Sequence, residues 1–220
     1  VMDMQSSLEI PSLPRRIAVI SSADAAGYGD FCHQLENNSG GFQFRTQLFA
    51  AIMQGEQSAK SIIQSLQQIA DEIDKWDIVV IVRGGGASTD LRNFDDYELA
   101  SHCAQFPLPI IAGIGHTRDI SIVDMVVHSS VKTPTAAAEW LINAMQQQAD
   151  RIAELYTHLQ RAIQHTINQQ HIRIEQLQQA LQFTSKKHLY QLRSQLEMWQ
   201  KTIELHSPER IYRMGYSLTT

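Results

Sequence analysis

The sequence predicts an α/β protein, in which a parallel sheet flanked by helices is followed by a long helical coiled-coil extension. Up to about residue 130, short apolar runs rich in β-branched residues alternate with helical patterns. Such alternation is typical of parallel strands joined by crossover helices. From Ala136 to Leu205 the sequence contains no glycine, is rich in glutamine, and has apolar residues at three- and four-residue steps. One narrow apolar stripe with polar residues elsewhere indicates a coiled coil.

The elements are predicted in chain order from these patterns. A buried strand at residues 17–21 is followed by a small-residue loop and a helix that carries Asp30 and His33. Further strands are expected at residues 42–49, 78–82 and 109–114, and further helices at 55–73, around Leu99 and at 119–127. The order predicts a Rossmann-like parallel sheet with helices on both faces. No GxGxxG motif follows the first strand, so the dinucleotide-binding fingerprint is absent.

The second part of the chain is predicted to begin as a helix at Thr133 and Pro134. Threonine suits the N-cap position and proline the first helical position. The gap in the apolar series between Leu181 and Leu189 indicates that the register slips there or that the chain reverses, and we favour a reversal into an antiparallel helical hairpin. The domains expected are a linker at residues 1–14, an α/β catalytic domain at 15–142, a coiled-coil region at 143–206, and a C-terminal segment at 207–220 that returns to the catalytic domain.

Composition restricts the classes of function. The net charge of −5 gives no overall basic field of the kind that attracts nucleic acid. The two cysteines, Cys32 and Cys103, form no CxxC motif, which predicts reduced thiols in a cytoplasmic protein and no cysteine zinc site. No apolar run is long enough for a membrane-spanning helix.

Two predicted strands end in glycine and then in residues suited to phosphate or proton chemistry. Arg83 precedes Gly84, Gly85 and Gly86, which could bind a phosphate or only form a tight turn, and Ser88 could cap the next helix. His116 and Asp119 are three residues apart on the next glycine-containing loop. They could be an acid–base histidine with its orienting carboxylate or two metal ligands, or His116 could simply cap a helix. The carboxyl ends of parallel strands are where such sheets bind ligands.

Four segments resemble motifs of the exodeoxyribonuclease VII large subunit family, in the same order and at the same spacing. These are RGGGASTDLRNFDD, PIIAGIGHTRDISIVDMVV, KTPTAAAEWL and the closing SPERIYRMGYSL. The resemblance covers nearly the whole chain. It implies the catalytic domain and coiled-coil region of a longer protein, without the N-terminal OB-fold domain of the family.

The resemblance implies four catalytic residues, Asp30, Arg83, His116 and Asp119. It also implies a substrate phosphate-binding set, which is Gly84, Gly85, Gly86, Ser88 and Lys132. The chain departs from the family pattern at Thr117, where the family has glutamate. A second departure is at Val131 and Lys132, because the family's RAPTPS-like segment reads SVKTPT in this chain. The family's arginine is absent there, and Lys132 nearby could substitute for it.

The activity implied by the resemblance is exonucleolytic hydrolysis of single-stranded DNA, from either end, with release of short oligonucleotides in DNA repair. No cofactor and no metal site are expected, although dependence on a divalent ion such as Mg²⁺ stays open. The expected partners are single-stranded DNA and several copies of the family's small subunit. The chain could also self-associate through its coiled coil, and no membrane is expected as a partner. Two alternatives stay open, a nucleotide- or phosphate-binding enzyme that uses the same sheet edge and a non-catalytic coiled-coil scaffold.

Overall fold

The computed structural model describes residues 4–84, 93–114 and 120–215. The chain divides into two compact units, Val1–Glu154 and Leu155–Thr220. The first unit contains the sheet. The long helix α5, Pro134–Leu205, begins in the first unit and continues through most of the second. None of the helices in the described ranges has an apolar stretch suited to crossing a membrane.

Within the described residues, five parallel strands form one sheet in the order β2-β1-β3-β4-β5. Their bounds are β1 Arg16–Ser21, β2 Arg45–Ala50, β3 Ile78–Val82, β4 Ile110–Gly113 and β5 Ser129–Ser130. The predicted fold class is confirmed. The two-residue strand β5 was not predicted, because it has no apolar pattern and is defined only by its pairing with β4.

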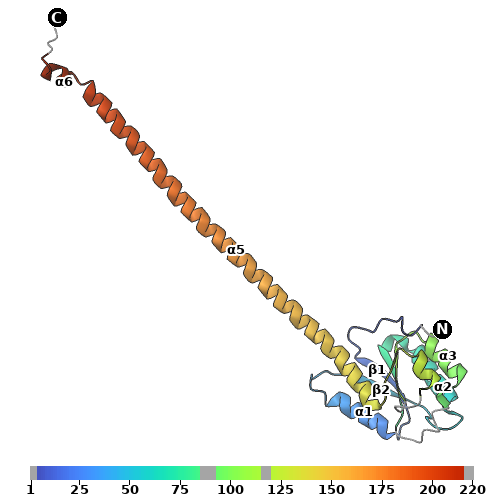
Figure 1. The fold of residues 1–220 in the computed structure, drawn as a ribbon. Helices are drawn as coiled ribbons and strands as arrows, with labels where there is room; N and C mark the ends of the chain where they lie inside the picture. The colour runs from blue at the N-terminus through green and yellow to red at the C-terminus, as the bar shows by residue number, and fades with distance from the viewer. Residues whose placement is uncertain (1–3, 85–92, 115–119, 216–220) are drawn as a thin grey trace. The chain divides into compact units, whose positions relative to one another are not determined.

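Helices cover both faces of the sheet (Figure 1). Besides α5, the described helices are α1 Ala26–Glu36, α2 Ser58–Asp71, the 3-10 helix η1 Ile73–Lys75, α3 Tyr97–Gln105, α4 Ile122–Val126 and α6 Pro208–Arg213. Alternate strand residues point to opposite faces. Ile20 and Ile81 therefore pack against α2, α3 and α4, whereas Val19 and Val80 pack against α1 and the start of α5.

The strand β2 begins at Arg45, three residues later than the sequence predicted. The side chain of Asn38 accounts for the difference: its Oδ1 accepts from the Phe42 N–H at 2.8 Å, and its Nδ2 donates to the carbonyl oxygens of Leu35 and Phe42. Gly41, with φ of 65°, completes this turn. Local side-chain bonds therefore hold residues 38–42 as a loop.

Gln5 lies in the segment predicted as a linker, yet its side chain is fully buried. Its Nε2 donates to the carbonyl oxygens of Phe106 at 2.7 Å and Leu108 at 3.1 Å. Its Oε1 accepts from the Ile110 N–H at 2.9 Å. One amide side chain thus pairs with three backbone groups at the start of β4.

The start of α5 agrees with the sequence prediction. Pro134 is its first residue, and the Oγ1 atom of Thr133 accepts from the Ala136 N–H at 3.1 Å, as an N-cap side chain does. Ala137, Ala138, Leu141 and Met145 of this helix are buried, and the first three pack against the sheet.

The prediction of a hairpin is wrong, because α5 is one continuous helix that passes through Phe183, Thr184 and Ser185. Residues eight apart, such as Leu181 and Leu189, still fall within one broad helical face, so the gap requires no reversal. No glycine or proline interrupts this segment, and threonine and serine lower helix stability only by tenths of a kcal/mol each.

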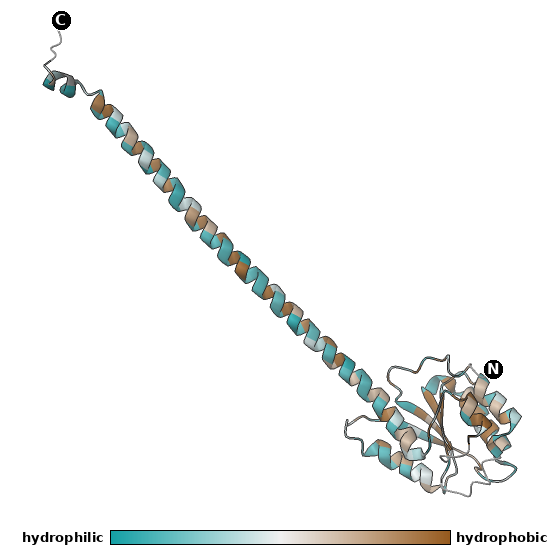
Figure 2. Ribbon diagram, in the orientation of Figure 1, coloured by the Kyte–Doolittle hydropathy of each residue, from teal (hydrophilic) through white to brown (hydrophobic). Residues whose placement is uncertain are grey.

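In the second unit, hydrophobic residues alternate with hydrophilic ones along α5 (Figure 2). The side chains of the large hydrophobic residues there are exposed to solvent. We call this set the coil stripe; its members are Leu155, Leu159, Ile163, Ile167, Ile174, Leu177, Leu181, Leu189, Leu192, Leu196, Trp199 and Ile203. An exposed apolar series of this length is unusual for a monomeric protein.

Candidate functional site

A cleft of about 440 Å³ lies at the carboxyl ends of β1, β2 and β3. Three segments line it: residues of the loop at 22–26 after β1, residues 51–54 after β2, and Arg83 with Gly84 after β3. All three strands run in the same direction, so their carboxyl ends meet at one edge of the sheet. This is the edge at which open α/β sheets bind ligands.

Arg83, whose side chain keeps its positive charge, is among the residues that line this cleft. It follows β3 directly, and its N–H donates to the Gly113 carbonyl oxygen of β4 at 3.3 Å. The residue is only 6% exposed, although it lines the cleft. A guanidinium group does not lose its proton in proteins, and a buried one favours an anion beside it. Its planar set of donors matches a phosphate group.

Gly84 allows the end of β3 to lie against the first turn of α1. A Cβ atom added to Gly84 would lie 3.2 Å from the Gly27 nitrogen, and one added to Gly27 would lie 2.8 Å from the Gly84 Cα. Ala25, at the N-cap of α1, makes no side-chain cap. The first turn of α1 therefore lies beside Gly84, and its N-cap residue supplies no side-chain bond to the N–H groups there, an arrangement that favours anions.

The predicted site residues are only partly covered by the structure. Arg83 and Gly84 lie together in the cleft. Gly85, Gly86, Ser88, His116 and Asp119 lie outside the described residues.

The two remaining predicted residues do not line the cleft. Asp30 is exposed on α1, and Lys132 is exposed two residues before α5. Among the acidic residues that the structure describes, Asp24 lines the cleft. The catalytic role of Asp30 and the phosphate-binding role of Lys132 stay predictions.

Ser22, Asp24, Ile52 and Gln54, on the loops after β1 and β2, line the cleft but were not predicted as site residues. Besides Asp30, the predicted residues follow residues 78–82 and 109–114, where each strand ends in glycine, or precede Pro134, as Lys132 does. The available signal was topological, because in a parallel sheet the residues after residue 50 reach the same edge as Arg83.

Metal binding was not expected from the sequence. In the part of the chain that the structure describes, no three His, Cys, Asp or Glu side chains come together as metal ligands would. His116 and Asp119 are outside that part, so the expectation of a metal-independent site stays a prediction.

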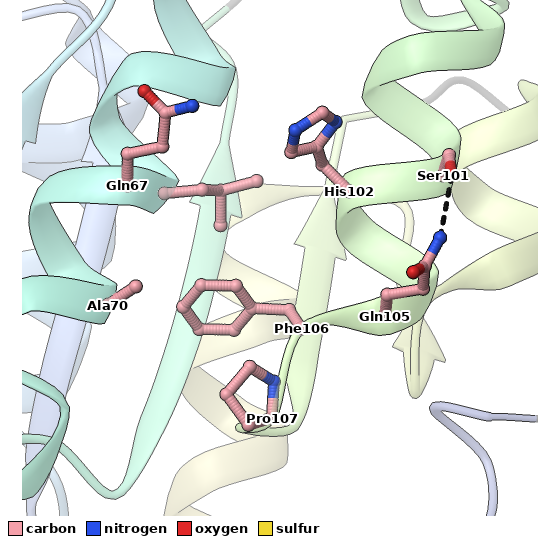
Figure 3. Close-up of a pocket in the computed structure, with 8 residues that line it drawn as sticks. Gln67, Ala70, Ser101, His102, Gln105, Phe106 and Pro107 are labelled. Carbon is pink, nitrogen blue, oxygen red and sulfur yellow. Dashed lines mark hydrogen bonds between the residues drawn. The ribbon is translucent and has the colours of Figure 1, made fainter.

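A second pocket, of about 290 Å³, lies between α2 and α3 (Figure 3). Its lining is apolar at Leu66, Ala70, Phe106 and Pro107, and its polar side chains include Ser101 and Gln105, which share a hydrogen bond of 2.8 Å. Among the described residues that line it there is no arginine or lysine, and Phe106 and Pro107 precede β4. These residues therefore supply no permanent positive charge for a phosphate group.

Comparison with known proteins identifies the family. The family model described as "Exonuclease VII, large subunit" matches residues 1–204. The exodeoxyribonuclease 7 large subunit of Lactobacillus helveticus is 32% identical over 160 residues, which cover 73% of this chain and 35% of the relative. The corresponding protein of Nostoc sp. is 32% identical over 167 residues, 76% of this chain and 40% of the relative.

A third relative, from Lactobacillus acidophilus, is 34% identical over 159 residues and is matched over 34% of its length. The chain thus spans between about a third and two-fifths of the relatives it matches. The family model covers the sheet, the cleft residues and almost all of α5. The chain therefore belongs to the exonuclease VII large subunit family.

Proposed function

We propose that this protein hydrolyses phosphodiester bonds in single-stranded DNA as an exonuclease and releases short oligonucleotides. The observation that carries the proposal is the cleft in which the buried Arg83 adjoins Gly84 and the uncapped start of α1. Membership in a family whose relatives are named exodeoxyribonucleases supports it.

The proposed chemistry is attack of water on phosphorus with loss of the bond to the leaving oxygen. Arg83 and the N–H groups of the first turn of α1 would stabilise the negative charge that develops on the phosphoryl oxygens. His116, oriented by Asp119, would protonate the leaving oxygen or accept the proton of the attacking water, and Asp30 would position that water. A covalent phosphohistidine on His116 is the other route consistent with these residues.

The coil stripe supports a proposal about partners. Its apolar side chains are too exposed to belong to a core of the described chain, and their helical spacing matches the faces of partner helices. We infer that several copies of the family's small helical subunit bind along α5. Without them the coil stripe would pair with that of a second chain.

The test uses the full-length protein with its small subunit and end-labelled single-stranded DNA, in chelator and then with Mg²⁺. Arg83→Ala should lower the cleavage rate about 10²-fold or more, the scale for loss of a transition-state charge partner. The matched control is Arg45→Ala, because Arg45 is exposed at the opposite, amino-terminal end of β2.

An Arg83→Ala variant that cleaves within threefold of wild type would exclude Arg83 from the mechanism. A wild-type complex that binds free nucleotide tightly but leaves DNA intact would instead favour the nucleotide-binding alternative. Comparison of the chelator and Mg²⁺ reactions decides the metal requirement.

A further inference from the structure

The loop after β2 supplies the cleft with an apolar side chain, Ile52, for which phosphate binding has no use, and with an amide, Gln54, which can both donate and accept. We propose that Ile52 and Gln54 form a nucleoside-binding subsite, which holds the sugar and base next to the phosphate bound at Arg83. The inference rests on the proposed function, since it names the part of the DNA strand that occupies the β2 side of the same cleft.

The loop is anchored so that these two side chains face outward. All four residues from Ala51 to Gln54 line the cleft. Ala51 and Met53 are buried in the core cluster beside α2, whereas Ile52 and Gln54, between and after them, are exposed. The Ile52 N–H donates to the Ser61 Oγ of α2 at 2.9 Å. The Ala51 N–H donates to the Ser21 carbonyl oxygen at 2.9 Å. These four anchors fix the positions of Ile52 and Gln54 before any ligand binds.

Gly55 ends the loop and leads the chain into α2. Its φ of 83° lies in the region that only glycine adopts at little cost, and its carbonyl oxygen accepts from the Ser58 N–H at 3.1 Å. The chain therefore turns away from the cleft immediately after Gln54. This geometry makes Gln54 the last residue of the loop that lines the cleft.

The lining divides into two chemical halves. Arg83, Gly84 and the start of α1 provide charge and backbone donors. On the β2 side, Ile52 is 50% exposed, so it offers apolar area that a flat, partly apolar ligand can cover. A nucleoside has such a face together with polar edges, and the Gln54 amide can both donate to and accept from those edges.

The ligand fits this division better than phosphate alone. A phosphate ion would leave Ile52 in water, and a wholly apolar ligand would make no use of the polar groups at Arg83 and Gly84. A cleft of about 440 Å³ falls within the usual size range of pockets for small ligands. Because one amide adapts to any base edge, the subsite should accept all four bases with similar affinity.

The test measures binding to the full-length protein in complex with its small subunit. Isothermal titration calorimetry compares each of the four deoxynucleoside 5′-monophosphates with inorganic phosphate. The variants are Ile52→Ser and Gln54→Ala, with Ile52→Thr as a second variant that keeps the β-branched shape. Gln57→Ala is the matched control, because Gln57 is an exposed glutamine only three residues further on and does not line the cleft.

Wild-type protein should bind the nucleotides about tenfold more tightly than inorganic phosphate. Ile52→Ser should remove most of this preference and Gln54→Ala part of it, both without changing phosphate affinity by more than twofold. In the nuclease assay these variants should raise KM with kcat nearly constant, as expected for contacts present equally in ground and transition states. Gln57→Ala should behave as wild type in both measurements.

Equal affinity for nucleotides and phosphate in wild type, or an unchanged preference in the Ile52 and Gln54 variants, would overturn the subsite. Equal melting temperatures establish that a variant is folded before its binding is compared. The calorimetry needs no cleavage, so a protein that shows the nucleoside preference but no nuclease activity would refute the proposed function and leave the binding assignment intact.

Discussion

Replacing Gln5 with alanine should destabilise the sheet domain more than is usual for a residue so near the first described residue of the chain. The side chain makes three bonds to the backbone, and those to Phe106 and Ile110 are buried. Each buried backbone group left without a partner costs about 1–3 kcal/mol. With two such groups, and water able to reach the third, we expect a loss of about 3 kcal/mol from a total stability of typically 5–15 kcal/mol.

Urea denaturation followed by tryptophan fluorescence measures the effect, since Trp76 is buried and packs edge-on against Phe49. Hydrogen exchange adds a local reading, because the Ile110 N–H that Gln5 accepts from should exchange faster in the variant. The control is Gln105→Ala, which removes an exposed hydrogen bond to Ser101 and should cost less than about 0.5 kcal/mol. If Gln5→Ala matched this control in both measurements, the docking of Gln5 beside β4 would be refuted.

Three further predictions concern other parts of the chain. Burial opposes ionisation of Asp77, but hydrogen bonds from the Arg16 side chain and from the Arg16 and Arg15 N–H groups outweigh it and hold the pKa of Asp77 below its usual value. A lowered pKa stabilises the fold above about pH 4, so the excess melting temperature of wild type over Asp77→Asn should be present at neutral pH and vanish as the pH falls below that value. Burial raises the pKa of the Cys103 thiol to about 12. A thiol reagent should therefore modify the half-buried Cys32 first and Cys103 only when the protein unfolds, which mass spectrometry can follow. Modification of Cys103 in the folded protein would contradict its burial. Changing Leu155, Leu159 and Ile163 together to aspartate should abolish co-purification with the small subunit while the sheet domain stays folded, and undiminished recovery would place the partner site elsewhere.

The features predicted well from the sequence are those that depend on local composition. The strand at Ile78–Val82 is buried along its whole length, so its β-branched run identified it directly. The N-cap at Thr133 is equally local. By contrast, Gln5 bonds to groups more than 100 residues away, and β5 exists because its pairing with β4 continues through the Val131 N–H, which donates to the Ala112 carbonyl oxygen. No pattern in either segment reports such contacts.

The candidate site divides in the same way. Arg83 and Gly84 were candidates because an arginine followed by glycines after a strand can bind phosphate as well as form a tight turn, and the family resemblance favoured phosphate binding. Ile52 and Gln54 were not candidates, because the run from Ala51 to Gln54 contains no charged residue and no motif that indicates a ligand. Its meaning depends on the alternation of buried and exposed side chains and on the neighbouring strand order, both of which are properties of the folded sheet.

The docked beginning of α5 has a consequence for how the helix forms. Starting an isolated helix is unfavourable by a factor of about 10³, whereas adding a residue to an existing helix is close to neutral or favourable for good helix formers. Pro134 fixes one backbone angle, Thr133 caps the first turn, and Ala137, Ala138 and Leu141 hold the following turns against the sheet. The folded sheet domain therefore acts as a nucleus from which the remaining turns propagate. Shortening the chain from Leu205 towards Leu155 should remove helical circular dichroism in proportion to the residues lost, while a free peptide of residues 155–205 should be far less helical than the same residues in the intact chain.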